Sequence, residues 1–214
     1  MHDPVPAPDG TAAQLVAAAL KLFGRKGFAA TSTREIAAEA GTNVASIAYH
    51  FGSKDGLRRA CGDEVARRIG RVIGDAAPTP PQSAEAAARQ MEAMLRAMTA
   101  FVAGSRASDD LTAFMLREVS EGGPVLDAVY GTMIDPLHRR FCALWAAATG
   151  QEAESETTRL LVFSLIGQVL YFRVGRPIVT RRMGWDSIGP DEAGRIAEIL
   201  AANLHSILAR ERLT

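Results

Sequence analysis

The sequence predicts an all-helical fold, and both composition and apolar spacing point to it. Of the 214 residues, 48% are hydrophobic, which is enough to build a buried core. Alanine, leucine, arginine and glutamate are abundant, while the residues that favour strands are sparse. Apolar residues recur at helical intervals along most of the chain. A chain of this length can hold one sizeable domain or two small ones.

Four helices are expected in the N-terminal part, after a flexible arm over residues 1–10 that contains three prolines. Thr11 is expected to cap the first helix, with Gln14 completing a capping box. Gly27 ends that helix, and Ser32 or Thr33 caps the next one. We expect these four helices at residues 11–27, 33–40, 44–51 and 53–73.

The second and third of these helices have the spacing of a helix-turn-helix. Ala37 is small enough for the two helices to cross closely. Gly41 can adopt the left-handed backbone that a tight turn requires. Ile47 is placed to pack back against the first helix of the pair. In such an arrangement the second helix enters the major groove of DNA, although the same pattern also occurs as plain structure.

A proline-rich segment at residues 75–83 is the clearest break in the chain. Beyond it the periodicity predicts long helices, separated by Gly122-Gly123-Pro124 and by a loop from Arg176 to Pro190. We expect these later helices at residues 84–103, 109–120, 125–149, 154–174 and 191–212.

Bulk properties exclude several classes of protein. The net charge is zero, but residues 1–74 carry ten Lys and Arg against seven Asp and Glu, so the N-terminal part is mildly basic. Cys61 and Cys142 are too few for a disulfide framework. The N-terminus has no apolar signal region, and the longest apolar run, at residues 160–172, is short for a membrane span, so we expect a cytoplasmic protein. Neither metal-ligand spacing nor an enzyme signature is present, so no catalytic residue, metal or cofactor is predicted.

The sequence around the helix-turn-helix resembles the TetR family of transcriptional regulators. The resemblance rests on LFGRKGFAATST followed by REIAAEAGTNVASIAYHFGSKDGL, and it covers about Ala12 to Ile69. LREVSEGGPVLDAV, followed by a long helix, also resembles the subgroup with a CerR-type C-terminal domain. The family implies a homodimer, with a three-helix DNA-binding domain and connecting helix at residues 11–74. A larger helical domain at residues 84–214 would serve effector binding and dimerisation.

The resemblance also assigns the residues that contact DNA. Those expected to face bases are Arg34, Thr42, Asn43, Val44, Ala45, Ser46 and Tyr49. Those expected to reach phosphates are Thr33, Tyr49, His50 and Lys54. Ala48 departs from the family, because many members have an aromatic residue there. Val44, Ala45 and Ala48 offer methyl groups, which suit thymine methyls or plain close approach. Tyr49 and His50 also fit an aromatic cap on the small domain's core.

A small-molecule effector is expected to enter an apolar pocket in the larger domain. The residues expected to line it are Met94, Met98, Phe101, Phe114, Met115, Arg117, Trp145, Gln168 and Tyr171. Helical spacing of methionine and aromatic residues fits an ordinary core equally well.

The run at residues 160–172 is apolar on almost every face, and the last helix carries a second apolar stripe. Two such helices from each of two subunits would form a four-helix interface, although a central helix of a monomer is also possible. The resulting prediction is a homodimeric regulator on a palindromic operator, a repressor released by a small molecule. The alternatives are a constitutive DNA-binding dimer without effector and a helical interaction protein that does not bind DNA.

Overall fold

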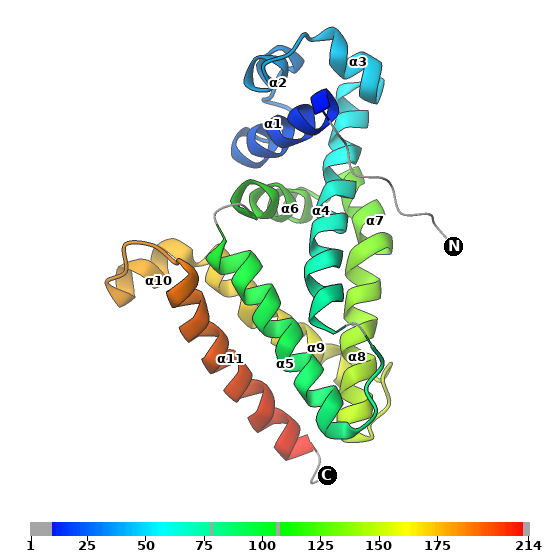
Figure 1. Cartoon of the computed structure of the whole chain (residues 1–214), viewed down its shortest axis with the longest axis vertical. Helices are drawn as coiled ribbons and strands as arrows, with labels where there is room; N and C mark the ends of the chain where they lie inside the picture. The colour runs from blue at the N-terminus through cyan, green and yellow to red at the C-terminus, as the bar shows by residue number, and fades with distance from the viewer. Residues whose placement is uncertain (1–9, 78, 106–107, 212–214) are drawn as a thin grey trace. The chain divides into compact units, whose positions relative to one another are not determined.

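The computed structural model describes residues 10–77, 79–105 and 108–211, and every regular element among them is helical. The all-helical prediction is therefore confirmed for these residues (Figure 1). The expected arm, apart from Gly10, lies outside the described residues. In chain order the helices are α1 (Gly10–Lys26), α2 (Thr33–Glu39), α3 (Ala45–Phe51), α4 (Lys54–Ala76), α5 (Ala84–Thr99), α6 (Asp109–Glu121), α7 (Pro124–Val129), α8 (Asp135–Thr149), α9 (Glu156–Val174), α10 (Arg176–Met183) and α11 (Pro190–Glu211). Two π-helical segments, η1 (Ala100–Gly104) and η3 (Tyr130–Ile134), continue α5 and precede α8.

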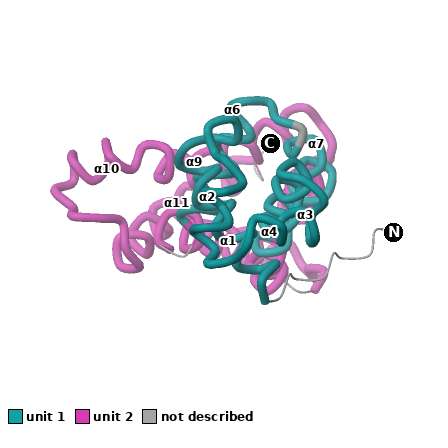
Figure 2. Tube along the Cα trace, turned by 90° about the horizontal axis from the view of Figure 1, so that it is seen from above, with its two compact units in different colours: residues 1–69, 109–133 teal, residues 70–108, 134–214 magenta. Residues whose placement is uncertain are grey.

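The helices form two compact units, which Figure 2 colours teal and magenta. Unit 1 comprises the described residues up to Ile69 together with Asp109–Met133. Unit 2 comprises Gly70–Ser108 and Ile134–Thr214, in its described part. The sequence predicted a division at the proline-rich segment, whereas here α6 and α7 group with the N-terminal helices. Helix α4 itself runs through the boundary between Ile69 and Gly70.

The core of unit 1 forms around Phe23 on α1, a helix that packs against α2, α3 and α6. The Phe23 ring lies 5.3 Å from the Phe28 ring and 6.3 Å from the Phe114 ring, measured between centroids. Tilted aromatic pairs at these separations add a favourable contact between rings to the apolar area that they bury. Leu15, Ile36 and other apolar residues complete this core without measurable exposure.

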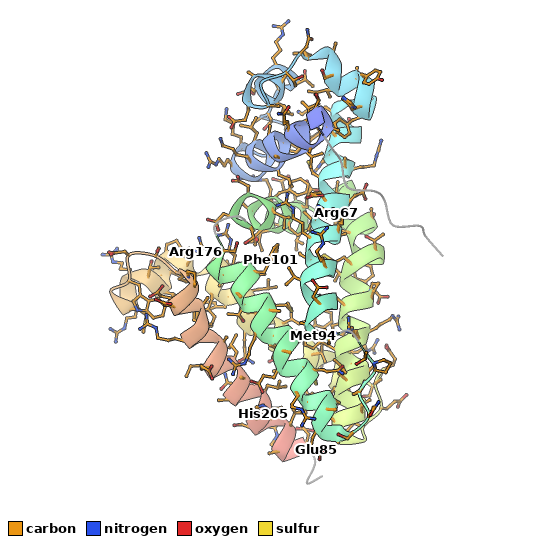
Figure 3. All side chains as sticks on the ribbon, in the orientation of Figure 1. Arg67, Glu85, Met94, Phe101, Arg176 and His205 are labelled. Atoms are coloured by element: carbon orange, nitrogen blue, oxygen red, sulfur yellow. The ribbon has the colours of Figure 1, made fainter. Side chains whose placement is uncertain are left out.

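The core of unit 2 forms along α5, which packs against α8 and α11, while α8 packs against α9. Figure 3 labels Met94 on α5 and Phe101 on η1 in this unit. The largest buried side chains here are apolar and come from three helices: Met91, Met94, Leu95, Phe141, Trp145 and Leu165. Their helical spacing is what the sequence indicated, because each helix turns one apolar face to its neighbours.

Two expectations from the sequence are wrong: an expected loop contains a helix, and the first helix begins one residue early. The loop expected from Arg176 to Pro190 contains α10, which runs to Met183. Pro177 occupies the first turn of that helix, and Gly184 closes it in the left-handed conformation. Proline and glycine are favoured at these two positions, so residues that read as loop-formers start and stop a helix here. Similarly, α1 begins at Gly10, which places Thr11 inside the helix rather than at its cap.

The single helix expected over residues 125–149 is interrupted by η3. Pro136 has no amide hydrogen for the carbonyl of Thr132, and its ring collides with that carbonyl in a regular α-helix. A wider π turn directly before the proline accommodates this mismatch.

Candidate nucleic-acid interface

Local capping fixes the start of α2, the first helix of the pair. Ser32 is its N-cap, and its hydroxyl accepts the amide of Glu35 while the Glu35 carboxylate accepts the amide of Ser32. Lys26 also donates to this carboxylate, at 2.7 Å. The pKa of Glu35 is lowered to about 2, chiefly by this contact with Lys26 and then by the hydrogen bonds from the backbone and hydroxyl of Ser32. The capping expected at Ser32 is thus present in full.

The turn between α2 and α3 has the structure that the spacing of Ala37, Gly41 and Ile47 predicted. Gly41 has φ of 66°, the left-handed conformation that the turn requires. The amide of Thr42 reaches back to the carbonyl of Ala37 at 2.9 Å, closing the end of α2. Ala37 and Ile47 are both buried, with 1% and 2% of their surface exposed. The predicted roles of these residues in the turn are confirmed.

Because Ile47 points inward, the opposite face of α3 is open. Tyr49 is 86% exposed and Val44 is 40% exposed. Ala45 and Ala48 are exposed as well. Tyr49 therefore does not cap the core, and its hydroxyl is accessible at the end of the helix.

The polar groups at the start of α3 largely bond to one another. The side-chain oxygen of Asn43 accepts the amide of Ala45, the first residue of α3, at 2.9 Å. The hydroxyls of Thr42 and Ser46 lie 3.1 Å apart and share a hydrogen bond. Arg34 on α2 is exposed, and the described residues offer it no ion pair. The base contacts expected of these residues stay predictions.

The four residues expected at phosphates have different surroundings. Thr33 is half-buried at the start of α2, and His50 is exposed with its ring edge-on to Tyr49 at 4.9 Å. Lys54 is half-buried, and its Nζ donates to the carbonyl of Phe28 at 2.5 Å and lies 4.2 Å from the Phe28 ring centroid. One of the three ammonium hydrogens of Lys54 is thus committed to the fold, which leaves two for a phosphate.

A buried ion pair in unit 1 was missed by the sequence analysis. Nε of Arg58 on α4 lies 2.8 Å from Oε1 of Glu118 on α6, and both residues are buried. The guanidinium also lies 4.4 Å from the centroid of Phe28, in the segment between α1 and α2. Sixty residues separate the two charges, so no local pattern could have paired them.

The residues expected around an effector are divided between the units. Phe114, Met115 and Arg117 belong to α6 in unit 1, and the other six belong to unit 2. Of those six, Met94 and Trp145 are fully buried, whereas Tyr171 is exposed. Unit 2 contains a half-open cavity of about 690 Å³ elsewhere, between the end of α5 and the start of α11. It is lined mostly by small residues such as Ala100, Gly104, Ala193 and Ala197, together with Arg96, and by none of the nine expected residues.

A row of exposed apolar side chains follows α9 in unit 2. Leu160, Phe163, Tyr171 and Val174 are each more than half exposed. Their intervals of three, eight and three residues keep them on one face of the helix. Phe163 stacks on the buried His138 of α8, with ring centroids 4.0 Å apart. No single helix among the described residues has the length and hydropathy to cross a membrane, and only the α9–α10 pair, bent by 73°, passes that test jointly.

Helix α2 is capped, Gly41 turns the chain in the left-handed conformation, and the inward Ile47 holds the exposed helix α3. Together these features define a helix-turn-helix protein of the DNA-binding class. Comparison with known proteins agrees with this class. Residues 15–61 match the family described as bacterial regulatory proteins, tetR family. Residues 87–210 match the C-terminal domain of the HTH-type transcriptional dual regulator CecR.

Relatives of the whole chain are regulators too. The chain is 36% identical to the HTH-type transcriptional dual regulator CecR of Shigella flexneri over 203 residues, which cover 91% of this chain and 90% of that protein. A TetR-like transcriptional regulator from Rhodococcus sp. RHA1 has the same fold, with a TM-score of 0.66 at 20% identity, over 95% of this chain and 99% of that one. So does AibR, whose crystal structure is a complex with isovaleryl coenzyme A and operator DNA, with a TM-score of 0.68 at 17% identity, over 90% and 96% of the chains.

The chain therefore belongs to the TetR family of transcriptional regulators and carries a C-terminal domain of the CecR type. The sequence resemblance to this family is confirmed, and the subgroup that it indicated as CerR-type bears the name CecR. The curated relatives that match this chain, including CecR, are transcriptional regulators.

Proposed function

We propose that this regulator is a repressor that binds a palindromic operator as a homodimer and is released by a small-molecule effector. The observation that carries the DNA-binding part is the open face of α3, where Tyr49 and Val44 are exposed while Ile47 anchors the helix. A helix presented in this way fits the major groove. DNA binding also implies that the protein acts in the cytoplasm, where a bacterial chromosome is accessible.

The dimer part is supported by the exposed apolar row on α9. Leu160, Phe163, Tyr171 and Val174 are large apolar side chains that are more than half exposed on one face of α9, and an exposed apolar face marks a protein–protein contact. Ile199 on α11 is also more than half exposed, and Asn203 of α11 donates to Gln168 of α9 at 2.8 Å, so the two helices lie together. A second copy of the chain that covered this face about a two-fold axis would present two α3 helices, which explains a palindromic operator.

The effector part is supported by the cavity in unit 2. Its volume of about 690 Å³ lies within the range of small-molecule sites, roughly 300–1,000 Å³. AibR, which shares the fold, is named as a complex with both an acyl coenzyme A and operator DNA. Coupling is expected through α4, because this helix carries the chain from unit 1 into unit 2 without a break. A shift of its tilt would change the spacing of the two recognition helices and weaken operator binding.

The DNA-binding proposal is tested by selecting duplexes from a random pool with the purified full chain. We expect an enriched palindrome whose two halves are centred about 34–36 Å apart, or a multiple of one helical turn. The variant Tyr49→Ala, altered on the open face of α3, should enrich it poorly. Enrichment of no sequence, with intact folding by circular dichroism, would contradict the proposal.

A constitutive dimer without an effector is the second candidate, and the filled core of unit 2 favours it. Met94 and Trp145, which were expected to line a pocket, have no exposed surface. A thermal-shift screen of small metabolites separates the two, because a ligand that binds only the folded chain raises the melting temperature. A ligand that raises it and also lowers operator affinity supports the effector, whereas a ligand that leaves operator affinity unchanged favours the constitutive dimer.

A further inference from the structure

The outward face of α3 consists of apolar groups rather than hydrogen-bonding groups. With about 100° between successive residues, Ala45 and Tyr49 lie opposite the buried Ile47, and the exposed Ala48 lies on the flank of the helix between them and Ile47. Val44 lies beside them at the start of the helix and is 40% exposed. Apart from the Tyr49 ring and hydroxyl, this face offers a groove only methyl groups.

The polar side chains near this face are partly engaged within the fold. The Asn43 oxygen accepts the amide of Ala45, and the hydroxyls of Thr42 and Ser46 share one hydrogen bond. A base that competed for the Asn43 oxygen or for the Thr42–Ser46 bond would have to displace an internal hydrogen bond, which cancels much of the gain. Helix α3 contains neither lysine nor arginine, so the usual bidentate contact with guanine is absent from it.

Only one apolar group projects into the major groove of B-DNA, the C5-methyl of thymine. Small aliphatic side chains recognise it by contact and by exclusion of water. We propose that Val44, Ala45 and Ala48 read thymine methyl groups, and that these contacts provide most of the direct sequence readout of α3. The inference rests on the proposed DNA-binding function and names the chemical feature of the half-site that the helix recognises.

The proposal is tested by replacing single thymines of the selected operator with deoxyuridine. This change removes one methyl group and retains the base pair. Burial of one methyl corresponds to about a four-fold change in affinity, so each contacted thymine should show about that loss. The symmetric change in both half-sites should give about a fifteen-fold loss. Thymines outside the half-sites should show none.

Two variants assign the readout to this face of the helix. In Val44→Ala, most of the side chain that would contact the methyl is gone, so the uracil penalty should shrink at the thymine nearest the start of α3. Tyr49→Phe is the matched control, because it loses a hydroxyl on the same face and keeps the aliphatic groups. The uracil penalty should therefore persist in this variant.

The outcomes separate the inference from the function on which it rests. If the operator binds specifically but uracil scanning is flat, methyl readout is overturned and DNA binding stands. If the uracil penalty is the same in Val44→Ala as in the unchanged chain at every position, the methyls act through DNA shape and the assignment is overturned. If no duplex binds specifically, the proposed function fails before methyl readout is reached.

Discussion

Arg58 and Glu118 form a buried ion pair in unit 1. Their side chains are 9% and 3% exposed, so both charges have lost most of their hydration. Oε2 of Glu118 has no hydrogen-bond partner among the described residues, and a Cβ built on Gly123 would lie 2.6 Å from it. The pair joins α4 to α6 beside the Phe28 ring, so it holds together the helices that support the helix-turn-helix.

Glu118→Ala should destabilise the chain strongly, because it leaves the Arg58 guanidinium buried without its partner. We expect a loss of about 3–5 kcal/mol in the free energy of unfolding, measured with chemical denaturant. Glu121→Ala on the same helix removes a partner from an exposed pair with Arg117 and should cost at most about 0.5 kcal/mol. The double change Arg58→Met with Glu118→Leu should recover most of the loss. A double variant as unstable as Glu118→Ala alone would show that packing, not the unpaired charge, causes the loss.

Glu35 gives a prediction for pH dependence. Its folded-state pKa of about 2 lies below the usual glutamate value of about 4.3. A depressed carboxyl pKa stabilises the fold above the unfolded value, and this stabilisation is lost as pH falls from about 4.3 through about 2. A carboxyl titration by NMR should place the midpoint near 2. Lys26→Ala should raise the midpoint most, since the Lys26 contact is the largest cause, and Ser32→Ala should raise it as well. A midpoint near 4 in the unchanged chain would contradict the described contacts.

At the scale of elements, local signals predicted the helix-turn-helix and missed features set by distant contacts. Ser32, Gly41 and Ile47 act through neighbours a few residues away, so their roles could be read from spacing. The grouping of α6 with the N-terminal helices depends on the packing of Phe114 near Phe23, which no local period reveals. Helix α10 was missed because proline and glycine are ambiguous until their place at a helix end is known.

Site prediction was limited for the same reason. Residue types at matching positions could suggest that Asn43 and Lys54 contact DNA. Their hydrogen bonds to Ala45 and Phe28 depend on the folded backbone, so these competing roles were not visible in the sequence. The cavity at the start of α11 is lined mostly by alanine and glycine, which carry no recognisable ligand pattern.

Helix α9 gives a prediction for assembly. The double change Leu160→Glu and Val174→Glu places two charges on the exposed apolar row. If this row is the dimer face, the variant should be a monomer by light scattering and should bind the palindrome at least ten-fold more weakly. Arg89→Glu, an exposed position on α5, is the charge-changing control and should remain a dimer. A double variant that stays dimeric would place the interface elsewhere.

At the scale of the whole molecule, the two compact units carry different parts of the proposed function. Unit 1 holds the DNA-reading helix, and unit 2 holds the cavity and the exposed apolar row. Helix α4 and the segment from α7 to α8 are each continuous between the two units along the chain. Such continuity would give the proposed effector a physical route from unit 2 to the recognition helix, provided that two states of α4 differ in effector affinity.

The most direct test of the central claim is fluorescence anisotropy of the full chain on the selected palindrome, with a scrambled duplex of the same composition beside it. A stoichiometric titration should give two chains per palindrome. At physiological salt the scrambled duplex should bind at least about 10³-fold more weakly, the usual gap between specific and non-specific binding. Affinity for both duplexes should fall as salt rises, because phosphate contacts release counterions. Equal affinity for the two duplexes, or one chain per palindrome at saturation, would contradict a dimeric sequence-specific regulator.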